Sequence, residues 1–159
     1  MISISDHKKV FLLRHSDAEY ISKSGKDFDR KLSQEGQQKI LHYKETYQHI
    51  LNVETVFCSS SHRTRETLRL LNLPINACSF HDELYGATTY ELISFLQAIP
   101  PFASSVLLVG HNPGLSDLVS YLIDERIDMN PFQLVEIELE IPEWKLISKG
   151  IGIEKRNLF

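Results

Sequence analysis

Residues 10–16, Val-Phe-Leu-Leu-Arg-His-Ser, form an apolar run that ends abruptly in an arginine, a histidine and a polar residue. A short apolar run bounded by polar residues is typical of a buried strand. In open α/β folds, ligands bind at the carboxyl ends of such strands. The stretch therefore predicts a strand that presents Arg14 and His15 to a ligand, although taken alone it is more often a strand end that simply reaches solvent.

Two later segments repeat this arrangement of an apolar run followed by polar residues. Residues 53–58 precede the polar segment 59–67, and residues 104–109 precede Gly-His-Asn-Pro-Gly at 110–114. The carboxyl ends of parallel strands meet at one edge of a sheet, so residues that follow these runs are expected to lie close together. The side chains brought together in this way would be Arg14, His15, Arg63 and His111.

This set of side chains is suited to phosphoryl groups. Arginine presents a planar fork of donors that matches phosphate oxygens, and two such forks neutralise most of the charge of a phosphate dianion. The helix expected after Asn112 adds free backbone N–H groups and the positive end of its dipole. Neutral imidazole attacks phosphorus at ordinary pH and can later leave again. The residues therefore predict a phosphoryl pocket in which a histidine is the candidate nucleophile.

Length and composition set the outer limits. With 159 residues the chain is expected to form one domain, residues 1–159, whose core is large enough to be stable without disulfide bonds or metal ions. The net charge is −4, and Lys and Arg are scattered among Asp and Glu, which argues against nucleic acid as a partner. Any site for an anion must then be local.

The sequence also favours a cytoplasmic protein that makes no membrane contact. No apolar run approaches the roughly 20 residues of a membrane span, and residues 1–6 lack the basic start and apolar core of a signal peptide. Cys58 and Cys78 lie in apolar surroundings without zinc-ligand spacing, so both are expected to be reduced core thiols. No histidine pair has the spacing typical of a metal site, and we expect no cofactor. The oligomeric state is left open and is compatible with a monomer.

The apolar periodicity alternates between strands and helices along the chain. Ser33 is typical of an N-cap for a helix that runs to about Ile50. Asn112 and Pro113 are typical of an N-cap followed by a first-turn proline. Strands that alternate with helices indicate a mostly parallel sheet covered on both faces. The expected strands are 10–13, 53–58, 77–80 and 104–109, and the expected helices are 33–50, around 67–71, 88–98 and about 113–122.

The last part of the chain predicts an antiparallel edge. In residues 134–141, glutamates alternate with apolar residues, which is the period-2 pattern of a half-exposed strand. Residues 144–148 are a candidate partner for it. The predicted fold class is therefore an α/β three-layer sandwich, with a mostly parallel central sheet, helices on both faces and an antiparallel edge.

The motifs, taken in order, resemble those of the histidine phosphatase superfamily, which has the phosphoglycerate-mutase-like fold. Residues 13–19, Leu-Arg-His-Ser-Asp-Ala-Glu, resemble the family signature, and residues 29–33 with Gly36 resemble its D-x-x-R-x-L-T-x-x-G region. Residues 59–67 resemble its S-x-x-x-R-A-x-Q-T segment, and residues 110–114 its distal G-H-N-P-G. The resemblance covers nearly the whole chain. The short length without a large insertion is most similar to the SixA-type phosphohistidine phosphatases.

This resemblance implies a cofactor-independent phosphatase that works through a phosphohistidine intermediate. It implies that His15 accepts the phosphoryl group, that Arg14 and Arg63 hold it, and that His111 hydrogen-bonds the same oxygens. The implied partner is a phosphorylated protein, such as one carrying phosphohistidine, or a small phosphorylated substrate. A small fold without insertions leaves an open cleft, which suits a protein-borne phosphoryl group.

Two further positions bear on substrate binding. Ser16 replaces the glycine that usually follows Arg-His, which reduces backbone freedom and would add a hydroxyl near the phosphoryl group. Arg30 either lines the mouth of the pocket or pairs with Asp27 or Asp29. Both Ser16 and Arg30 are therefore candidate substrate-binding residues.

The general acid is less well defined. Mutases and broad phosphatases of the family use a carboxylic acid to protonate the leaving oxygen. Glu83 is the best candidate in this sequence and Asp82 the next. A solvated loop carboxylate is an equally good interpretation, because SixA-type enzymes lack a well-placed acid and a leaving imidazole needs less help than an alkoxide.

Two other classes of protein are also considered. Cys58 follows a strand and precedes a helix, as the nucleophile of a cysteine phosphatase does, but four residues separate it from Arg63 where that loop needs five. A non-catalytic module would instead keep the pocket and bind a phosphorylated partner. The complete set of arginines and histidines favours the histidine phosphatase.

Overall fold

One sheet organises the described part of the chain. The structure is a computed structural model that describes residues 6–75 and 77–158. In chain order its elements are β1 (Lys8–Arg14), η1 (Asp27–Asp29), α1 (Gln34–Ile50), β2 (Thr55–Ser59), α2 (His62–Leu71), β3 (Cys78–His81), η2 (Asp82–Leu84), α3 (Thr89–Gln97), β4 (Ser105–Gly110), α4 (Gly114–Ile123), β5 (Leu134–Leu139), η3 (Trp144–Leu146) and β6 (Gly152–Leu158).

The sheet places the ends of β1 and β4 side by side. Its strand order is β3-β2-β4-β1-β5-β6. Strands β1 to β4 run parallel, and β5 runs antiparallel to both of its neighbours. Arg14 pairs with Gly110 in the register of β1 on β4, so the residues that follow them leave the sheet at the same edge. The mixed sheet confirms the predicted fold class.

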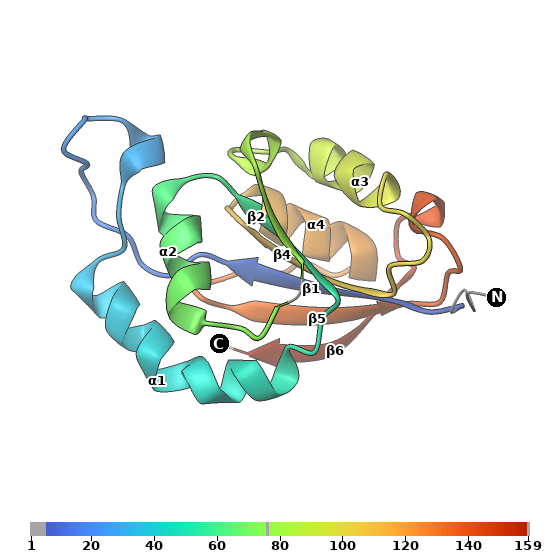
Figure 1. Cartoon of the computed structure of the whole chain (residues 1–159). Coiled ribbons are helices and arrows are strands. Elements are labelled where there is room, and N and C mark those ends of the chain that lie inside the picture. Colours follow the sequence, from blue (N-terminus) through green and yellow to red (C-terminus); the bar gives the residue numbers. More distant parts are fainter. Residues whose placement is uncertain (1–5, 76, 159) are drawn as a thin grey trace.

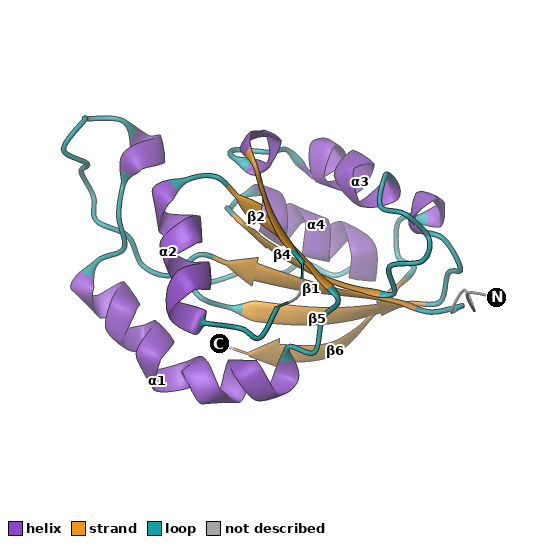
Figure 2. Ribbon diagram, in the orientation of Figure 1, coloured by secondary structure: helices purple, strands orange, loops and turns teal. Residues whose placement is uncertain are grey.

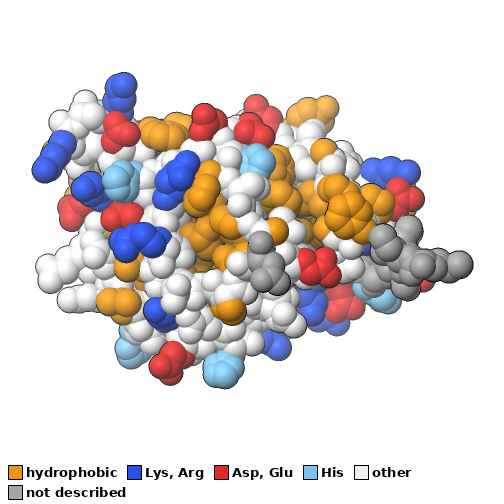
Figure 3. All heavy atoms as spheres, in the orientation of Figure 1, with side chains coloured by type: hydrophobic (Ala, Val, Ile, Leu, Met, Phe, Trp, Pro, Cys, Tyr) orange, Lys and Arg blue, Asp and Glu red, His pale blue; other side chains and the backbone are white. Residues whose placement is uncertain are grey.

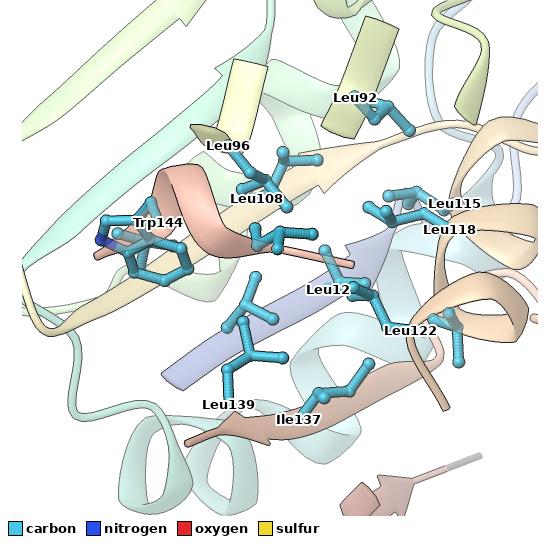
Figure 4. Close-up of a cluster of buried hydrophobic side chains, with 14 of the residues drawn as sticks. Leu12, Leu92, Leu96, Leu108, Leu115, Leu118, Leu122, Ile137, Leu139 and Trp144 are labelled. Carbon is cyan, nitrogen blue, oxygen red and sulfur yellow. The ribbon is translucent and has the colours of Figure 1, made fainter. Parts of the chain in front are cut away.

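Two pairs of helices cover the two faces of the sheet (Figure 1 and Figure 2). Helices α3 and α4 pack with η3 over a core that includes Leu12, Leu108 and Trp144 (Figure 4). Helices α1 and α2 pack on the opposite face, over a core that includes Leu13 and Tyr47. Because both faces of the central strands are buried, β1 and β4 are continuous apolar runs rather than alternating ones.

Local sequence sets the helix ends. The hydroxyl of Ser33 accepts the backbone N–H of Gly36 and caps α1. Thr88 and Glu91 form a reciprocal capping box at the start of α3. Helix α2 ends at Asn72, which adopts the left-handed conformation with φ 48°. The helices predicted at 33–50 and 88–98 are thereby confirmed as 34–50 and 89–97.

Helix α4 starts one position later than predicted. Pro113, and not Asn112, occupies the N-cap position, and the peptide bond between them is cis. Asn112 still serves the helix, because its Oδ1 accepts the backbone N–H of Ser116 at 3.3 Å and the Ser116 hydroxyl at 2.8 Å. This side chain ties the segment that carries His111 to the first turn of α4.

Strand β5 is not half-exposed, which corrects the prediction. Glu136 is only 5% exposed, and its carboxylate lies 3.2 Å from Lys9 Nζ on β1 and 3.2 Å from Arg156 Nε on β6. The partner strand is β6, whereas residues 144–146 form the 3₁₀ turn η3. The alternating pattern therefore indicated a strand but not its exposure, because cations on both neighbouring strands neutralise the buried glutamate.

The loop after β1 is anchored to the start of α1. The hydroxyl of Ser33 donates to the carbonyl oxygen of Asp17 at 3.2 Å, and the hydroxyl of Ser16 donates to the carbonyl oxygen of Gly36 at 2.9 Å. A Cβ atom on Gly36 would lie 2.1 Å from the Asp17 carbonyl oxygen, so only glycine allows this approach. The chain that follows His15 is thereby fixed before it extends outward to η1, at the upper left of Figure 1.

The surface carries charges of both signs. Figure 3 shows Lys and Arg interspersed with Asp and Glu on the face it presents, without a continuous basic stripe there. Cys58 is buried as predicted, whereas Cys78 is exposed because it lies on the edge strand β3. No helix within residues 6–75 and 77–158 is long and apolar enough to cross a membrane. Residues 1–5, on which the signal-peptide prediction rests, lie outside the described residues.

Candidate active site

His15 and His111 lie next to each other where β1 and β4 end. The backbone N–H of His15 donates to the carbonyl oxygen of Gly110 at 3.2 Å. The centroids of the two imidazole rings are 5.2 Å apart, and the rings are tilted by 56°. His15 is 9% exposed and His111 is 8% exposed. The structure thus brings these two predicted site residues together at the edge of the sheet.

One hydrogen bond fixes which nitrogen of His15 carries the proton. Its Nδ1 lies 2.7 Å from the backbone carbonyl oxygen of Ser16. A carbonyl only accepts, so Nδ1 carries the hydrogen and Nε2 carries the lone pair. Burial, reinforced by the charges of Arg63 and Arg14, lowers the pKa of His15 to about 4 against the opposing effect of the Ser16 bond. Near neutral pH the ring is therefore uncharged, with Nε2 unprotonated.

Arg63 lies in the first turn of α2 and faces this nitrogen. Its Nε donates to Nε2 of His15 at 3.2 Å. Its Nη1 donates to the backbone carbonyl of Asp27 at 2.8 Å, and its Nη2 donates to Oδ2 of the same residue at 2.9 Å. The contact with His15 requires Nε2 to accept, which agrees with the tautomer set by Ser16.

Arg14 supplies a second guanidinium. Its Nη1 donates to the carbonyl oxygen of Met129 at 2.8 Å. Its Nε is buried and has no hydrogen-bond partner among the described residues. Burial lowers the pKa of Arg14, yet a guanidinium stays charged at neutral pH. A buried donor without a partner is costly, so it marks a position where a ligand acceptor would be stabilising.

His111 offers another donor of this kind. The hydroxyl of Ser59 lies 2.8 Å from Nε2 of His111. The hydroxyl of Ser61 lies 3.4 Å from the same nitrogen. With a hydroxyl donating to Nε2, the ring proton lies on Nδ1. Nδ1 is buried and has no partner among the described residues. Burial and the neighbouring His15 lower the pKa of His111 to about 3, so the ring is neutral.

Together these side chains form a site for an oxyanion. The two guanidinium groups supply positive charge, and Arg14 Nε and His111 Nδ1 supply buried donors without partners in the described structure. Phosphoryl oxygens accept such bonds, and their negative charge offsets the paired cations. Arg14 and His15 also line a hollow of about 290 Å³ that a ligand can enter. The arrangement can therefore hold a phosphoryl group beside an unprotonated nitrogen.

Ser16 and Arg30 take different places from those expected of simple phosphate ligands. The Ser16 hydroxyl is fully buried and donates to Gly36, so its backbone carbonyl rather than its hydroxyl serves the site. Arg30 lines the same hollow as His15, but its Nη1 also donates to Asp27 Oδ1 at 2.8 Å. Both interpretations given for Arg30 thus hold at once.

The structure does not bring Glu83 or Asp82 to the histidines. The Glu83 side chain is 63% exposed, and its Oε1 lies 3.2 Å from Nδ1 of His81. Asp82 is exposed in the same 3₁₀ turn, η2. No hydrogen bond or ion pair among residues 6–75 and 77–158 joins either carboxylate to His15 or His111. The structure therefore favours the interpretation of Glu83 as a solvated loop carboxylate.

Asp27 is a site residue that the sequence analysis did not identify as such. Besides Arg63 and Arg30, its carboxylate accepts the Tyr85 hydroxyl at 2.6 Å. The bonds from Tyr85, Arg30 and Arg63 hold the pKa of this carboxyl well below its usual range. The Tyr85 ring in turn packs edge-on against His111, with centroids 5.4 Å apart. Asp27 and Tyr85 therefore contact the site through Arg63 and His111.

Correct spacing of one motif would have found Asp27. In D-x-x-R-x-L-T-x-x-G the acidic residue stands three positions before the arginine. Counted back from Arg30, that residue is Asp27 and not Asp29, which was predicted to stand there. Asp29 accepts the hydroxyl of Ser24 instead.

The thiol of Cys58 is a poor nucleophile in this fold. Its side chain is fully buried, and burial raises its pKa to about 12. A protonated, buried thiol does not attack phosphorus, since the thiolate is the reactive form. The geometry therefore favours His15 over Cys58. Separately, no group of three His, Cys, Asp or Glu residues in the described ranges could hold a metal ion.

Known proteins show the same fold and the same motif region. The family model described as histidine phosphatase superfamily (branch 1) matches residues 10–84. A candidate SixA phosphohistidine phosphatase from Nakamurella multipartitia is 22% identical over 99% of this chain and 98% of that chain, with a TM-score of 0.82. One from Agrobacterium tumefaciens is 21% identical over 96% and 97%, with a TM-score of 0.79. The protein histidine phosphatase SixA complexed with tungstate is 23% identical over 94% and 96%, with a TM-score of 0.77. No curated protein matches the sequence.

Residues 10–84 thus resemble the histidine phosphatase superfamily, and the solved structures share the fold over nearly the whole chain. The matched residues include Arg14, His15 and Arg63. His111 lies beyond them, and the parallel register of β4 on β1 brings it to the same place.

Proposed function

We propose that this protein is a phosphatase that works through a covalent phosphohistidine on His15, and that its substrate is phosphohistidine carried by a protein. The observation that carries the proposal is the state of His15 Nε2. It is unprotonated because Ser16 holds the ring proton on Nδ1, and it lies 3.2 Å from Arg63 Nε. A neutral imidazole nitrogen beside a guanidinium is suited to attack a phosphorus atom whose oxygens that guanidinium neutralises.

Binding exchanges one set of hydrogen bonds for another. As a phosphoryl group enters, Nε of Arg63 transfers its bond from His15 Nε2 to a phosphoryl oxygen and so releases the lone pair. Arg14 Nε and His111 Nδ1 donate to the other oxygens, which satisfies the two buried donors that lack partners in the described structure. The nucleophile becomes available only when an anion has taken its place on Arg63.

The reaction then proceeds in two displacements. The Nε2 lone pair forms a bond to phosphorus while the bond from phosphorus to the leaving imidazole nitrogen breaks, and that nitrogen takes the electron pair and then a proton from solvent. Water then attacks the same phosphorus, the P–Nε2 bond breaks, and its electron pair returns to Nε2. The oxygen of this water stays on the phosphate, and one of its protons returns to solvent. Inorganic phosphate leaves, and His15 is regenerated with its proton still on Nδ1.

Two observations favour phosphohistidine as the substrate. The Glu83 carboxylate is exposed and bonded to His81 rather than to the site, and a leaving imidazole needs less proton donation than an alkoxide. Three proteins with a similar fold are described as phosphohistidine or protein histidine phosphatases. A small phosphorylated molecule is the competing substrate class.

Trapping of the intermediate tests the proposal. Brief mixing of the wild-type enzyme with a ³²P-labelled phosphohistidine protein is expected to leave an acid-labile, alkali-stable label on the enzyme. His15→Ala is expected to carry no label and to lose about 10⁴-fold or more of the turnover, while Cys58→Ser keeps both. A label that survives acid, or that persists in His15→Ala, would exclude the mechanism. Higher kcat/KM on sugar phosphates than on phosphohistidine proteins would assign the other substrate class.

A further inference from the structure

We infer that Asp27 is a positioning residue for this reaction, and that it holds the guanidinium of Arg63 in the orientation that faces His15. The inference rests on the proposed function, because it concerns the same phosphoryl site. Nothing in the reaction requires the Asp27 carboxylate to touch the substrate, so its effect would pass through Arg63.

Asp27 contacts the guanidinium twice. Its backbone carbonyl accepts from Nη1 at 2.8 Å, and its carboxylate accepts from Nη2 at 2.9 Å. The remaining nitrogen, Nε, is the one that faces His15. With both terminal nitrogens tied to a single residue, the plane of the guanidinium and the direction of Nε–H are determined together.

The position of Asp27 is itself fixed from several sides. Arg30 donates to Oδ1 at 2.8 Å, and Tyr85 donates to Oδ2 at 2.6 Å. Phe28, the next residue in η1, packs edge-on against the Tyr85 ring with centroids 4.9 Å apart. The turn η1 is thus attached to α2 through Arg63 and to the segment after η2 through Tyr85. An exposed loop of this kind needs such ties to hold an arginine still.

The negative charge of Asp27 acts on phosphoryl binding in two opposite ways. A carboxylate close to an anion site repels the phosphoryl oxygens, so it would weaken binding if it did nothing else. Arginine has many rotamers, and fixing them in advance removes an entropic cost from the binding step. We expect the benefit of a fixed Arg63 to exceed the repulsion. Removing the charge would then weaken anion binding, whereas it would strengthen binding if repulsion were the larger effect.

The test compares Asp27→Asn with Asp29→Asn. Both variants remove one negative charge from η1, but Asp29 bonds to Ser24 rather than to an arginine. Tungstate affinity is measured by calorimetry, and kcat and KM are measured on an aryl phosphate. Asp27→Asn is expected to weaken tungstate binding and lower kcat/KM by about tenfold each, because a bond between two charged groups becomes one in which only the guanidinium is charged. Asp29→Asn is expected to resemble the wild type, and Asp27→Glu to recover part of the loss.

Two results would overturn the inference. Tighter tungstate binding by Asp27→Asn would mean that the carboxylate only competes with the anion, and unchanged binding would mean that it does not act on Arg63. If Asp27→Asn does not fold, Tyr85→Phe is used in its place, because it removes a single donor to the carboxylate. The inference then requires that Tyr85→Phe also weakens tungstate binding. Tungstate binding is independent of turnover, so an enzyme that forms no adduct on His15 would refute the proposed function and still report on Asp27.

Discussion

The floor of the site and its rim are built in different ways. The floor consists of side chains at strand ends, and the register of β1 on β4 sets the distance between His15 and His111. The rim consists of exposed turns, and there a hydrogen bond joins the side chains of Asp27 and Tyr85 while Phe28 packs on the Tyr85 ring. The sheet therefore fixes the chemistry, whereas the loops adjust the orientation of one arginine and the approach of the substrate.

Ser59 allows the floor to be altered through a residue that orients His111. Ser59→Ala removes the hydroxyl that bonds Nε2 of His111 at 2.8 Å. Nε2 then keeps only its longer contact with the Ser61 hydroxyl at 3.4 Å, which orients the ring less firmly. We expect kcat/KM to fall about 10–100-fold, the range found when the partner that orients a site histidine is removed. Nitrogen NMR of the labelled imidazole would show whether the tautomer changes. An unchanged tautomer with unchanged activity would show that Ser59 does not orient His111.

A second prediction uses pH to probe the buried histidines of the floor. The folded-state pKa of His15 is about 4 and that of His111 about 3, below the unfolded value near 6.5. Between about pH 6.5 and 4 the unfolded chain binds protons that the folded chain does not. The free energy of unfolding is therefore expected to fall as pH falls through this window, by about 1.4 kcal/mol per pH unit for each histidine.

Urea unfolding at a series of pH values measures this slope. His15→Ala is expected to remove the part of the slope that belongs to His15, and a rim variant such as His81→Ala is expected to keep it. The same pKa predicts that kcat/KM declines with acid only as pH falls toward about 4. A decline centred near 6.5 would show that His15 titrates as it does in water.

The smallest expected effect lies on the rim. Glu83→Gln is expected to change turnover of a phosphohistidine protein by less than about twofold, because Glu83 is exposed and bonded to His81. Assays on alkyl phosphates are the sensitive comparison, since a working general acid would cost about 10²–10⁴-fold there. A loss of that size would move Glu83 into the catalytic machinery and break the division between floor and rim.

The sequence predicted the floor far better than the rim. Apolar runs that stop at Arg14 and at Gly110 encode where a strand ends, and that is all the floor requires. The spacing of a local motif marks Asp27 itself, but its contacts with Arg63 and Tyr85 join residues 36 and 58 positions apart and follow from no local pattern. Strand β6 was not predicted from the sequence, because its exposed and mostly polar residues lack a clear apolar period.

Burial of charge was likewise beyond local reasoning. The alternation around Glu136 predicted an exposed face, yet the sheet places cations on both neighbouring strands against that residue. Only the strand order β1-β5-β6 brings Lys9 and Arg156 to it. Local periodicity therefore reports the type of element, and the sheet order determines which of its side chains are covered.

Gly36 touches no substrate, yet it governs where the proton of His15 resides. Its bare Cα admits the Asp17 carbonyl, and its own carbonyl holds the Ser16 hydroxyl at 2.9 Å. Were a methyl group added there, the loop would have to move outward and carry away the Ser16 carbonyl that keeps hydrogen on Nδ1. The imidazole could then adopt its other tautomer, in which Nε2 bears hydrogen and has no electron pair for phosphorus. The reactivity of a side chain at the end of one strand is thus set by how closely a helix in another layer can approach the loop behind it.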